Sequence, residues 1–455
     1  MLRSFNPSRS SRAIAFMTAV IIAGIAGDAC VGTVHAQPLG LSALTTFGSN
    51  GWLAPGANSY LTPPTGRTER GLAYNPVTQN LVLVSRASVS GTGNNIVILN
   101  GTTGSVDKLM NANGISGGTF TVNMAGVSSD GKIYVGNLAT GGGAFKVYSW
   151  DGESSLVAPT VPFQWTVPAN STTSSGTGAY RFGDSFDVYG SGTNIQFAAA
   201  GNTTGTTGGL GTGFRNNGNF LVGTTDTTNT FTLFKGMANT GTTTNNYRLS
   251  LSYVDADTLI GMEGGAAKLT DFIFSSGTQQ GVNATVISSI QSGAAPLGGT
   301  SEYRIVDYVA MGPKSYLAAL RTGNAGTGAG ANIVDVYDIT STMTQLSGTS
   351  PVLVASLSVT TGSNANPDGT GQLAWGAVTY DSVNQIYSAP LYALNTNNGI
   401  QAMVFAVPEP TTTLAAGICT IGLAGMMLRG RRMTPSEARM AKRRRHPSER
   451  RAGCP

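Results

Sequence analysis

The central part of the chain, residues 37–407, contains no cysteine and no histidine. All residues of these two types lie nearer the ends, at His35, His446, Cys30, Cys419 and Cys454. This segment can therefore form no disulfide, no thiolate nucleophile, no Cys/His zinc site and no Ser-His-Asp triad. We expect no metal and no cofactor, and an enzyme built on it would depend on carboxylates, tyrosine or arginine.

Charge is divided unevenly along the chain. Residues 37–407 carry 14 Lys and Arg against 18 Asp and Glu, a net charge of −4. Residues 408–455 carry 10 basic and 3 acidic residues, a net charge of +7, so the formal charge of +5 arises from the tail. The central part lacks the basic surplus typical of nucleic-acid-binding domains, and we expect no nucleic-acid partner.

Long apolar runs occur only near the two ends. Residues 1–36 have the form of a secretory signal, with arginines before the run AIAFMTAVIIAGIAG and a small-x-small site at Val34-His35-Ala36. We expect export through the Sec translocon and cleavage between Ala36 and Gln37. The run is too short to span a bilayer. A lipoprotein signal at Cys30 is an alternative that fits its motif less well.

The second apolar run covers residues 411–428, which are 18 uncharged residues. As a helix rising 1.5 Å per residue, they would cross most of a hydrocarbon core of about 30 Å. The basic residues Arg429, Arg431 and Arg432 would hold the following end in the cytoplasm. This pattern predicts an inner-membrane helix with the central part outside the membrane; a buried core helix is the alternative.

Three parts of the C-terminal region, in order, resemble the PEP-CTERM sorting signal of exported bacterial proteins: Val407-Pro408-Glu409-Pro410, the apolar run, and the arginine cluster that ends at Arg432. The resemblance implies recognition by an exosortase-type membrane protease near Pro-Glu-Pro. It also implies loss of the tail and release or attachment at the cell surface or outer envelope, often in bacteria that make exopolysaccharide.

The chain departs from this family after the arginine cluster, because residues 433–455 continue where such signals usually stop. This basic tail would be cytoplasmic, and its length bears on how efficiently the signal would be processed. We interpret its charge as a topology determinant or a membrane-surface contact. The predicted domains are thus a signal peptide (1–36), a body (37–406), a sorting signal (407–432) and a basic tail (433–455).

The body shows almost no helical periodicity. Short β-rich runs alternate with loops rich in Gly, Thr, Asn and Ser, which is typical of all-β folds. A weak repeat of strand, polar turn and strand begins at Gly71, Gly126, Phe186, Leu251, Val306 and Gly376. Second pairs of strands follow most repeats, as in residues 94–110, 144–157 and 332–359.

Four strands per repeat, repeated about six times, predict a β-propeller of six to seven four-stranded blades. One such sheet cannot bury both faces alone, whereas radially stacked blades cover each other. The N-terminal strands around Leu41 to Trp52 could complete a seventh blade. A β-helix or two sandwiches are the alternatives. GLAYNPVTQNLVLVSR and VSSDGKIYVGNL also resemble an uncharacterised family of secreted bacterial propellers, from which no activity follows.

Arginines and tyrosines recur at matching positions of the repeat. Arg70, Arg181, Arg248 and Arg304 open first strands, and Tyr74, Tyr253 and Tyr308 follow. If these strands line a channel, the guanidinium groups would form a ring suited to carboxylates, sulfates or phosphates, and the aromatic rings could stack on sugars. The competing interpretation, which we favour, is that each arginine pairs with a nearby acid such as Asp184, Asp187, Asp307 or Glu302.

Other acidic patterns are less specific. NANPDG, residues 364–369, resembles the start of a calcium loop but has Trp375 at the twelfth position, so a turn explains it better. Glu69, Glu263 and Glu302 are carboxylates that a glycosidase could use, with no spacing that pairs two of them. We predict an exported cell-surface or matrix module with a binding or structural role, for which acidic polysaccharide is the candidate ligand. The alternative is a histidine-free polysaccharide hydrolase or lyase.

Overall fold

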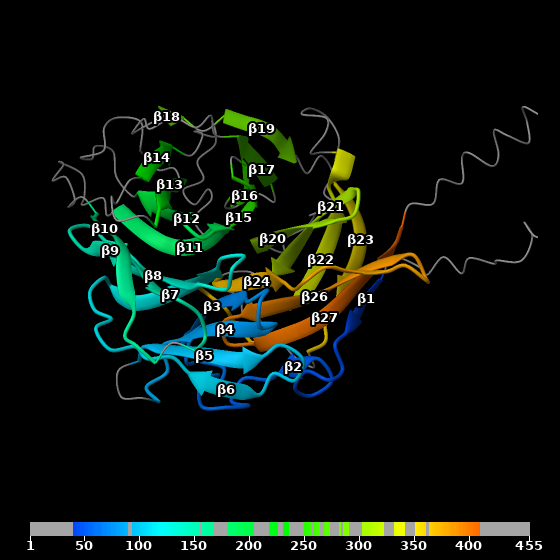
Figure 1. Ribbon diagram of the computed structural model, residues 1–455, viewed down its shortest axis with the longest axis horizontal. Coiled ribbons are helices and arrows are strands. Elements are labelled where there is room, and N and C mark those ends of the chain that lie inside the picture. The colour runs from blue at the N-terminus through cyan, green and yellow to red at the C-terminus, as the bar shows by residue number, and fades with distance from the viewer. Residues whose placement is uncertain are drawn as a thin grey trace, which may run out of the picture. The chain divides into compact units, whose positions relative to one another are not determined.

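The computed structural model describes residues 40–89, 93–154, 156–167, 180–203, 218–225, 231–235, 250–256, 258–263, 268–273, 282–283, 285–290, 303–322, 332–341, 351–360 and 364–409. These residues form antiparallel β-strands joined by turns and loops (Figure 1), which confirms the predicted all-β class. The chain divides into two compact units, residues 1–408 and 409–455, and every described strand belongs to the first.

The strands form five hydrogen-bonded sheets, and the largest, of nine strands, consists of two groups joined by one short pairing. The resulting six groups are called blades 1 to 6 in chain order. Blade 1 contains β3 (Glu69–Tyr74), β4 (Asn80–Ser85), β5 (Asn95–Asn100) and β6 (Val106–Leu109). Blade 2 contains β7 (Phe120–Val127), β8 (Ile133–Thr140), β9 (Ala144–Trp150) and β10 (Thr160–Thr166). Blade 3 contains β11 (Tyr180–Ser191), β12 (Asn194–Thr203), β13 (Gly218–Thr224) and β14 (Phe231–Lys235), with the short β18 (Val282–Asn283) parallel to β14.

Blade 4 contains β15 (Leu251–Asp255), β16 (Thr258–Glu263), β17 (Lys268–Ile273) and β19 (Thr285–Ile290). Blade 5 contains β20 (Tyr303–Met311), β21 (Lys314–Arg321), β22 (Ile333–Asp338) and β23 (Val352–Leu357). Blade 6 contains β24 (Gly371–Trp375), β26 (Ile386–Asn395), β27 (Gly399–Pro408) and β1 (Gly40–Ala43), with β2 (Trp52–Leu53) and β25 (Thr379–Asp381) at its sides.

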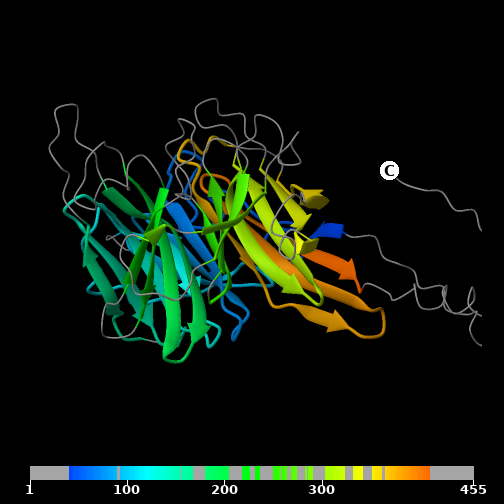
Figure 2. The same cartoon turned by 90° about the horizontal axis from the view of Figure 1, so that it is seen from above.

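The first strand of each blade lies innermost, and these inner strands contact one another in a closed cycle of β3, β7, β11, β15, β20 and β24. All six line one cavity at the centre; Figure 1 shows the blades around this centre, and Figure 2 shows the same blades turned by 90°. A sheet that repeats around an axis in this way is a β-propeller. Blades 2 and 3 are also joined by a short pairing of β8 with β11, at Thr140 and Arg181.

The N-terminal strand completes blade 6 and does not begin a seventh blade. In β1, Gly40 pairs with Ala406 and Leu41 with Phe405, so this strand is the outermost of the sheet that ends the chain's last repeat. β2 pairs with the same strand β27 through Trp52 and Leu53. The predicted seventh blade at Leu41 to Trp52 is therefore wrong, because both strands pair with β27 and form the outer side of blade 6.

Five of the six repeat units fall on an inner strand and its hairpin partner, and the sixth does not. The inner strand of blade 6 is β24, which ends at Trp375, one residue before the predicted start at Gly376. The predicted strand–turn–strand unit instead covers the side hairpin of β25 and β26. In blade 2, the expected strand near Leu156 and Val157 is exposed loop, and β10 begins only at Thr160.

Alternating side chains in the middle strands pack against different neighbouring blades. In β4, Leu81 and Leu83 join a cluster with residues of blade 6, whereas Val82 and Val84 join a cluster with residues of blade 2. Successive side chains of a strand point to opposite faces, so one apolar run fills two interfaces. This explains why these strands read as continuous apolar sequence: both faces of each blade are covered.

Gly71 in β3 allows the inner strands of blades 1 and 2 to approach closely. A Cβ at this position would lie 2.6 Å from the backbone nitrogen of Ala125 and 2.8 Å from Cα of Met124. Since backbone atoms cannot move aside singly, we expect Gly71→Ala to lower the free energy of unfolding by about 2 kcal/mol. Chemical denaturation measures this change. Gly114→Ala, where no atom lies within 4 Å, is the control and should show only the smaller effect of its positive φ.

The last strand overlaps the predicted sorting signal. Val407 and Pro408 belong to β27 and pair with Tyr387 and Ile386, so the predicted boundary at residue 406 lies inside this strand. The described residues include no helix long and apolar enough to cross a membrane. The signal peptide, the predicted span 411–428 and the arginines Arg429, Arg431 and Arg432 lie outside the described residues.

Candidate functional site

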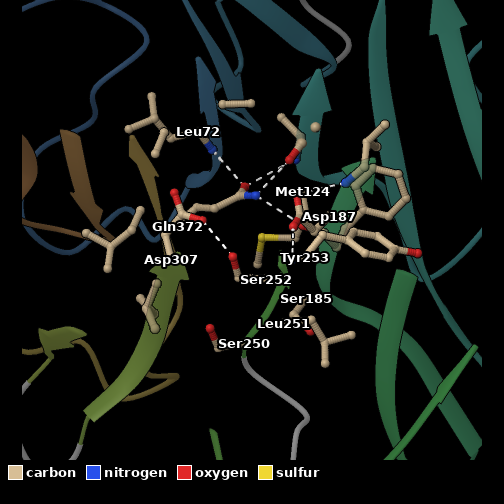
Figure 3. Close-up of a pocket in the computed structure, with 18 of the residues that line it drawn as sticks. Leu72, Met124, Ser185, Asp187, Ser250, Leu251, Ser252, Tyr253, Asp307 and Gln372 are labelled. Atoms are coloured by element: carbon tan, nitrogen blue, oxygen red, sulfur yellow. Dashed lines mark hydrogen bonds between the residues drawn. The ribbon is translucent and has the colours of Figure 1, made fainter. Parts of the chain in front are cut away.

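The central cavity is lined by all six inner strands and has a volume of about 240 Å³. The edge of an inner strand has no further strand to pair with, so its N–H and C=O groups need other partners. Polar side chains supply many of them. Asp187 of β11, Ser252 of β15, Asp307 of β20 and Gln372 of β24 project into this region in Figure 3.

Three of these side chains occupy matching positions and each binds the backbone of the next blade. The Asp187 carboxylate accepts a hydrogen bond from the Tyr253 N–H at 2.7 Å. The Ser252 hydroxyl accepts one from Tyr308 at 3.0 Å, and Asp307 accepts one from Trp375 at 2.9 Å. Ser252 also donates to Asp307 at 2.8 Å. These bonds join blades 3, 4, 5 and 6 in sequence.

Gln372 joins blade 6 to blades 1, 2 and 3. Its Oε1 accepts hydrogen bonds from the backbone N–H of Leu72 at 3.0 Å and of Ala125 at 3.3 Å. Its Nε2 donates to the carbonyls of Ala125 at 2.7 Å and of Phe186 at 3.1 Å. The side chains of Asp187, Ser252, Asp307 and Gln372 thus link the inner strands through hydrogen bonds, and we call this set the polar belt. Gln372 closes it (Figure 3).

The two aspartates of the central cavity have unusual proton affinities. Burial, together with the charge of Asp307, raises the pKa of Asp187 to about 7. Burial raises the pKa of Asp307 to about 6, although hydrogen bonds from Ser252 and Trp375 favour its charged form. Desolvation and a like charge both disfavour a second carboxylate in one small cavity. The pair therefore titrates near neutral pH.

The predicted tyrosines Tyr74, Tyr253 and Tyr308 all line the central cavity. The Tyr74 ring stacks on Tyr392, with centroids 6.0 Å apart. Tyr253 is buried against Tyr189, and its hydroxyl has no hydrogen-bond partner among the described residues. The Tyr308 hydroxyl lies 3.0 Å from Ser315 Oγ. The structure brings these three residues together, but separately from the arginines.

A second cavity, which we call the arginine cavity, lies where inner strands of blades 1, 2 and 3 begin and has a volume of about 740 Å³. Among its lining residues are four arginines and two aspartates, Arg67, Arg70, Arg86, Arg181, Asp184 and Asp368. Phe120 and Asn123 of β7 also line it. Ligand pockets commonly have volumes of about 300–1,000 Å³.

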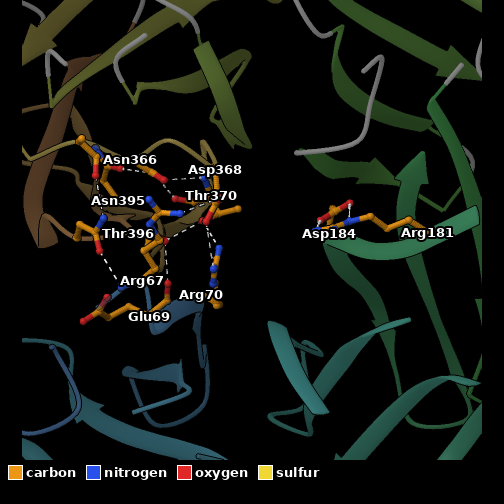
Figure 4. Close-up of polar contacts among 12 residues, drawn as sticks. Arg67, Glu69, Arg70, Arg181, Asp184, Asn366, Asp368, Thr370, Asn395 and Thr396 are labelled. Carbon is orange, nitrogen blue, oxygen red and sulfur yellow. Dashed lines mark hydrogen bonds and ion pairs between the residues drawn. The ribbon is translucent and has the colours of Figure 1, made fainter. Parts of the chain in front are cut away.

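Arg70 and Arg181, both predicted site residues, line the arginine cavity and pair with acids (Figure 4). Arg181 Nε lies 2.6 Å from Oδ2 of Asp184, and these bonds raise the pKa of Arg181 against the effect of burial. Arg70 donates to Thr370 at 2.5 Å and lies 3.4 Å from Asp368. Burial lowers the pKa of Arg70, and the charge of Asp368 opposes this. Pairing with acids is thus correct for both arginines.

Two arginine nitrogens at this cavity are buried and form no hydrogen bond to any described residue: Arg70 Nε and Arg86 Nη1. The Arg86 guanidinium lies 3.8 Å from the centroid of the Phe120 ring. A buried donor without a partner is unfavourable, by about 1–3 kcal/mol when it is fully desolvated. The arginine cavity is therefore lined by more cationic than anionic side chains, and part of their donor capacity is not used by the described residues.

The remaining predicted arginines cannot be placed beside these. Arg248 lies outside the described residues, and Arg304 lies in β20 with its side chain outside them. Asp187 and Asp307, expected as possible arginine partners, instead accept backbone hydrogen bonds in the central cavity.

The carboxylates considered for catalysis do not form a pair in the described part of the chain. Glu69 is buried and accepts hydrogen bonds from the Thr62 backbone N–H and hydroxyl. Glu302 and the side chain of Glu263 lie outside the described residues.

The NANPDG segment is a turn. Asn366 bonds to Thr370 and Asn395, and Asp368 lies within ion-pair distance of Arg67 and Arg70. Within the described residues, no group of three His, Cys, Asp or Glu could hold a metal ion.

Sequence reasoning missed Gln372, Arg67, Arg86 and Phe120. Arg86 ends the segment GLAYNPVTQNLVLVSR, directly after the second strand of that hairpin. This position gave no sign that its side chain lines a cavity at the start of the inner strands. The sequence did contain a signal for the polar belt, because Asp187, Ser252 and Asp307 occupy the same position of the aligned repeats. A tyrosine follows each of them one or two residues later. Gln372 was missed because the sixth repeat was placed after it.

No family model matches this chain, and no curated protein matches it. Among solved structures, it is similar to a DUF4623 family protein from Bacteroides eggerthii, with a TM-score of 0.52 and 16% identity over 76% of this chain and 72% of that chain. It is less similar to the GH93 α-L-arabinofuranosidase of Fusarium graminearum, with a TM-score of 0.42 and 9% identity over 78% of this chain and 96% of that chain. The first likeness concerns the fold alone, and the second is too weak to bear on function.

Proposed function

We propose that this chain is an exported, surface-associated binding module built on a six-bladed propeller, and that the arginine cavity binds acidic polysaccharide. The observation that carries this proposal is the composition of that cavity, where four arginines face only two aspartates. Two buried arginine nitrogens there lack partners among the described residues. Arginine engages carboxylate and sulfate groups in a planar, bidentate manner, so anionic sugars suit the site.

Phe120 adds a second reason to favour a carbohydrate. Phe120 is 40% exposed and lines the arginine cavity, and the Arg86 guanidinium lies 3.8 Å from the centroid of its ring. An aromatic face beside cationic groups can stack on a sugar ring while the cations bind its acidic substituent. The predicted arginines Arg248 and Arg304 would extend the site if their side chains also face the channel.

Delivery to the cell surface is part of the same proposal and follows from the sequence. The secretory signal favours export through the Sec translocon, and residues 407–432 favour exosortase-type processing after transient anchoring in the inner membrane. The final location would be the cell surface, the outer envelope or the extracellular matrix. An alkaline-carbonate wash of membranes before and after maturation tests whether the anchor is present and then lost.

A polysaccharide hydrolase is the second candidate, favoured by the aspartate pair of the central cavity. Carboxylic acids with pKa values near 6 and 7 could act as general acids. Both oxygens of each carboxylate, however, already accept hydrogen bonds from the protein, including those from Val188 and Tyr308. We therefore favour binding over catalysis.

The experiment is a binding assay of the full chain with dextran sulfate, polygalacturonate and neutral dextran at low salt. We expect retention on the two anionic polymers only, with no shortening of either. The double variant Arg67→Gln, Arg86→Gln should weaken retention at least tenfold, about 1.4 kcal/mol or more, because it removes the two cationic groups of the cavity that form no close ion pair with a described residue.

The control is Lys108→Gln, Lys132→Gln, which removes the same charge outside the arginine cavity. If both double variants weaken binding equally, binding depends on net charge and the arginine cavity is not the site. New reducing ends or unsaturated products would instead support the hydrolase or lyase.

A further inference from the structure

The β25–β26 hairpin presents apolar side chains to solvent at the side of blade 6. Val378 is 38% exposed, Tyr380 44% and Val383, at the turn, 88%. Single exposed apolar residues are common, but here three occur within six residues of one hairpin. In the segment from Val378 to Ser388, Asp381 is the only charged residue.

The hairpin is ordered by its own contacts. The rings of Tyr380 and Tyr387 lie on neighbouring strands with centroids 4.6 Å apart. Asp381 accepts hydrogen bonds from the N–H groups of Val383 at 2.9 Å and Asn384 at 3.1 Å, and from the Asn384 side chain at 2.7 Å. These bonds fix the turn so that Val383 stays at its tip.

This hairpin lies beside the point where the chain leaves the propeller. Ile386 at the start of β26 pairs with Pro408, the last residue of β27, and Tyr387 pairs with Val407. The strands are antiparallel, so the turn at Val383 extends beyond Ile386 in the direction in which β27 ends. Figure 1 shows β26 and β27 side by side.

We propose that the β25–β26 hairpin contacts the lipid headgroup region of the membrane that residues 411–428 cross. This inference rests on the membrane anchoring in the proposed function. Pro408 is three residues from the apolar run, and three residues span at most about 10 Å. Val383 is likewise three residues from Ile386, which pairs with Pro408. The hairpin tip therefore lies within reach of any bilayer that the C-terminal run enters.

The chemistry of the hairpin suits an interface and not the hydrocarbon core. Tyrosine is enriched at the headgroup level, where its ring is apolar and its hydroxyl remains hydrated. Hydrogen bonds from Asn384 lower the pKa of Asp381, so this carboxylate stays charged and must remain among the headgroups. A shallow contact by Val383 and Tyr380 would orient the propeller and leave the arginine cavity, at the beginning of the inner strands, open to polysaccharide.

The test uses the full chain with its three cysteines replaced by serine and one new cysteine, Val383→Cys, labelled with a fluorophore. The protein is reconstituted into phosphatidylethanolamine and phosphatidylglycerol vesicles that contain a lipid spin-labelled at headgroup depth. We expect spin label to reduce the fluorescence at position 383 about twofold or more, because interfacial side chains lie within the headgroup layer. Val89→Cys is the control, since Val89 is also exposed, at 42%, but follows Ser88 on the side of the arginine cavity; its fluorescence should change little.

Resistance of the chain to an alkaline-carbonate wash is measured on the same samples. A wash-resistant chain with equal quenching at positions 383 and 89 would overturn the hairpin contact and leave the anchor intact. A chain released by the wash would overturn both. Strong quenching at 383 alone in a wash-resistant chain supports the proposal.

Discussion

Replacing Gln372 with leucine is expected to lower the free energy of unfolding by about 4 kcal/mol, because four backbone groups in three blades lose their partner. Leucine has nearly the same volume, so the loss is of hydrogen bonds and not of packing. Urea denaturation followed by tryptophan fluorescence measures the change. The transition should also broaden if blade 6 separates from blades 1 to 3 before the others unfold.

Gln196→Leu provides the matched control for this change. Gln196 also bridges two blades, but through a single exposed hydrogen bond of 3.0 Å to the Ala256 carbonyl. We expect it to lower stability by less than about 1 kcal/mol. Equal effects of the two leucine variants would show that Gln372 does not hold the blades together.

The second large effect is a fall in stability as the pH rises. The folded-state pKa values of Asp187, about 7, and Asp307, about 6, both exceed the ordinary value of 3.8. The folded chain therefore binds more protons than the unfolded chain between about pH 4 and pH 7. Their contribution to stability is fully present below pH 4 and is lost as the pH rises through 6 and 7. We expect a decrease on the order of 3 kcal/mol between pH 5 and pH 8.

Urea titrations at several pH values check this slope. Asp307→Asn should make the slope clearly shallower, since it removes one titrating group and the charge that raises the pKa of Asp187. The slope is the informative quantity, because asparagine places a donor against the Trp375 N–H and lowers stability at every pH. Asp381→Asn, on the exposed hairpin, should leave the slope between pH 5 and 8 unchanged. A stability that is constant or rises over this range would contradict the assignment.

Much of the fold could be predicted from the sequence, because local signals and packing agree. Runs such as the one from Leu81 to Val84 are apolar at every position, which is what a strand covered on both faces requires. The sixth repeat could not be placed in this way. β24 is only five residues long, whereas the hairpin of β25 and β26 that follows it imitates a full strand–turn–strand unit.

The candidate site was predictable only in part, for a geometric reason. Arg70 and Tyr74 lie in one strand, but four residues extend about 13 Å, so arginines and tyrosines at these positions belong to different cavities. Arg70 and Arg181 occupy matching positions of the repeat, which correctly predicted that they lie near each other; both line the arginine cavity. Arg86 ends the first repeat unit and Gln372 lies before the sixth, so neither shares the position of Arg70 or of Asp187. Arg86 lies over Phe120 of blade 2, and Gln372 bonds to blades 1 to 3; only the closed ring creates these contacts.

The pairing of β1 with β27 has a consequence for biogenesis. Leu41 and Phe405 are joined across a loop of about 360 residues, so the ring closes only after nearly the whole chain has been delivered. A chain that is still being synthesised would therefore have an open ring and an unpaired strand edge, which favours aggregation. We expect the chain to be most prone to aggregation during this interval, before the final ten residues of the propeller, β27, are available.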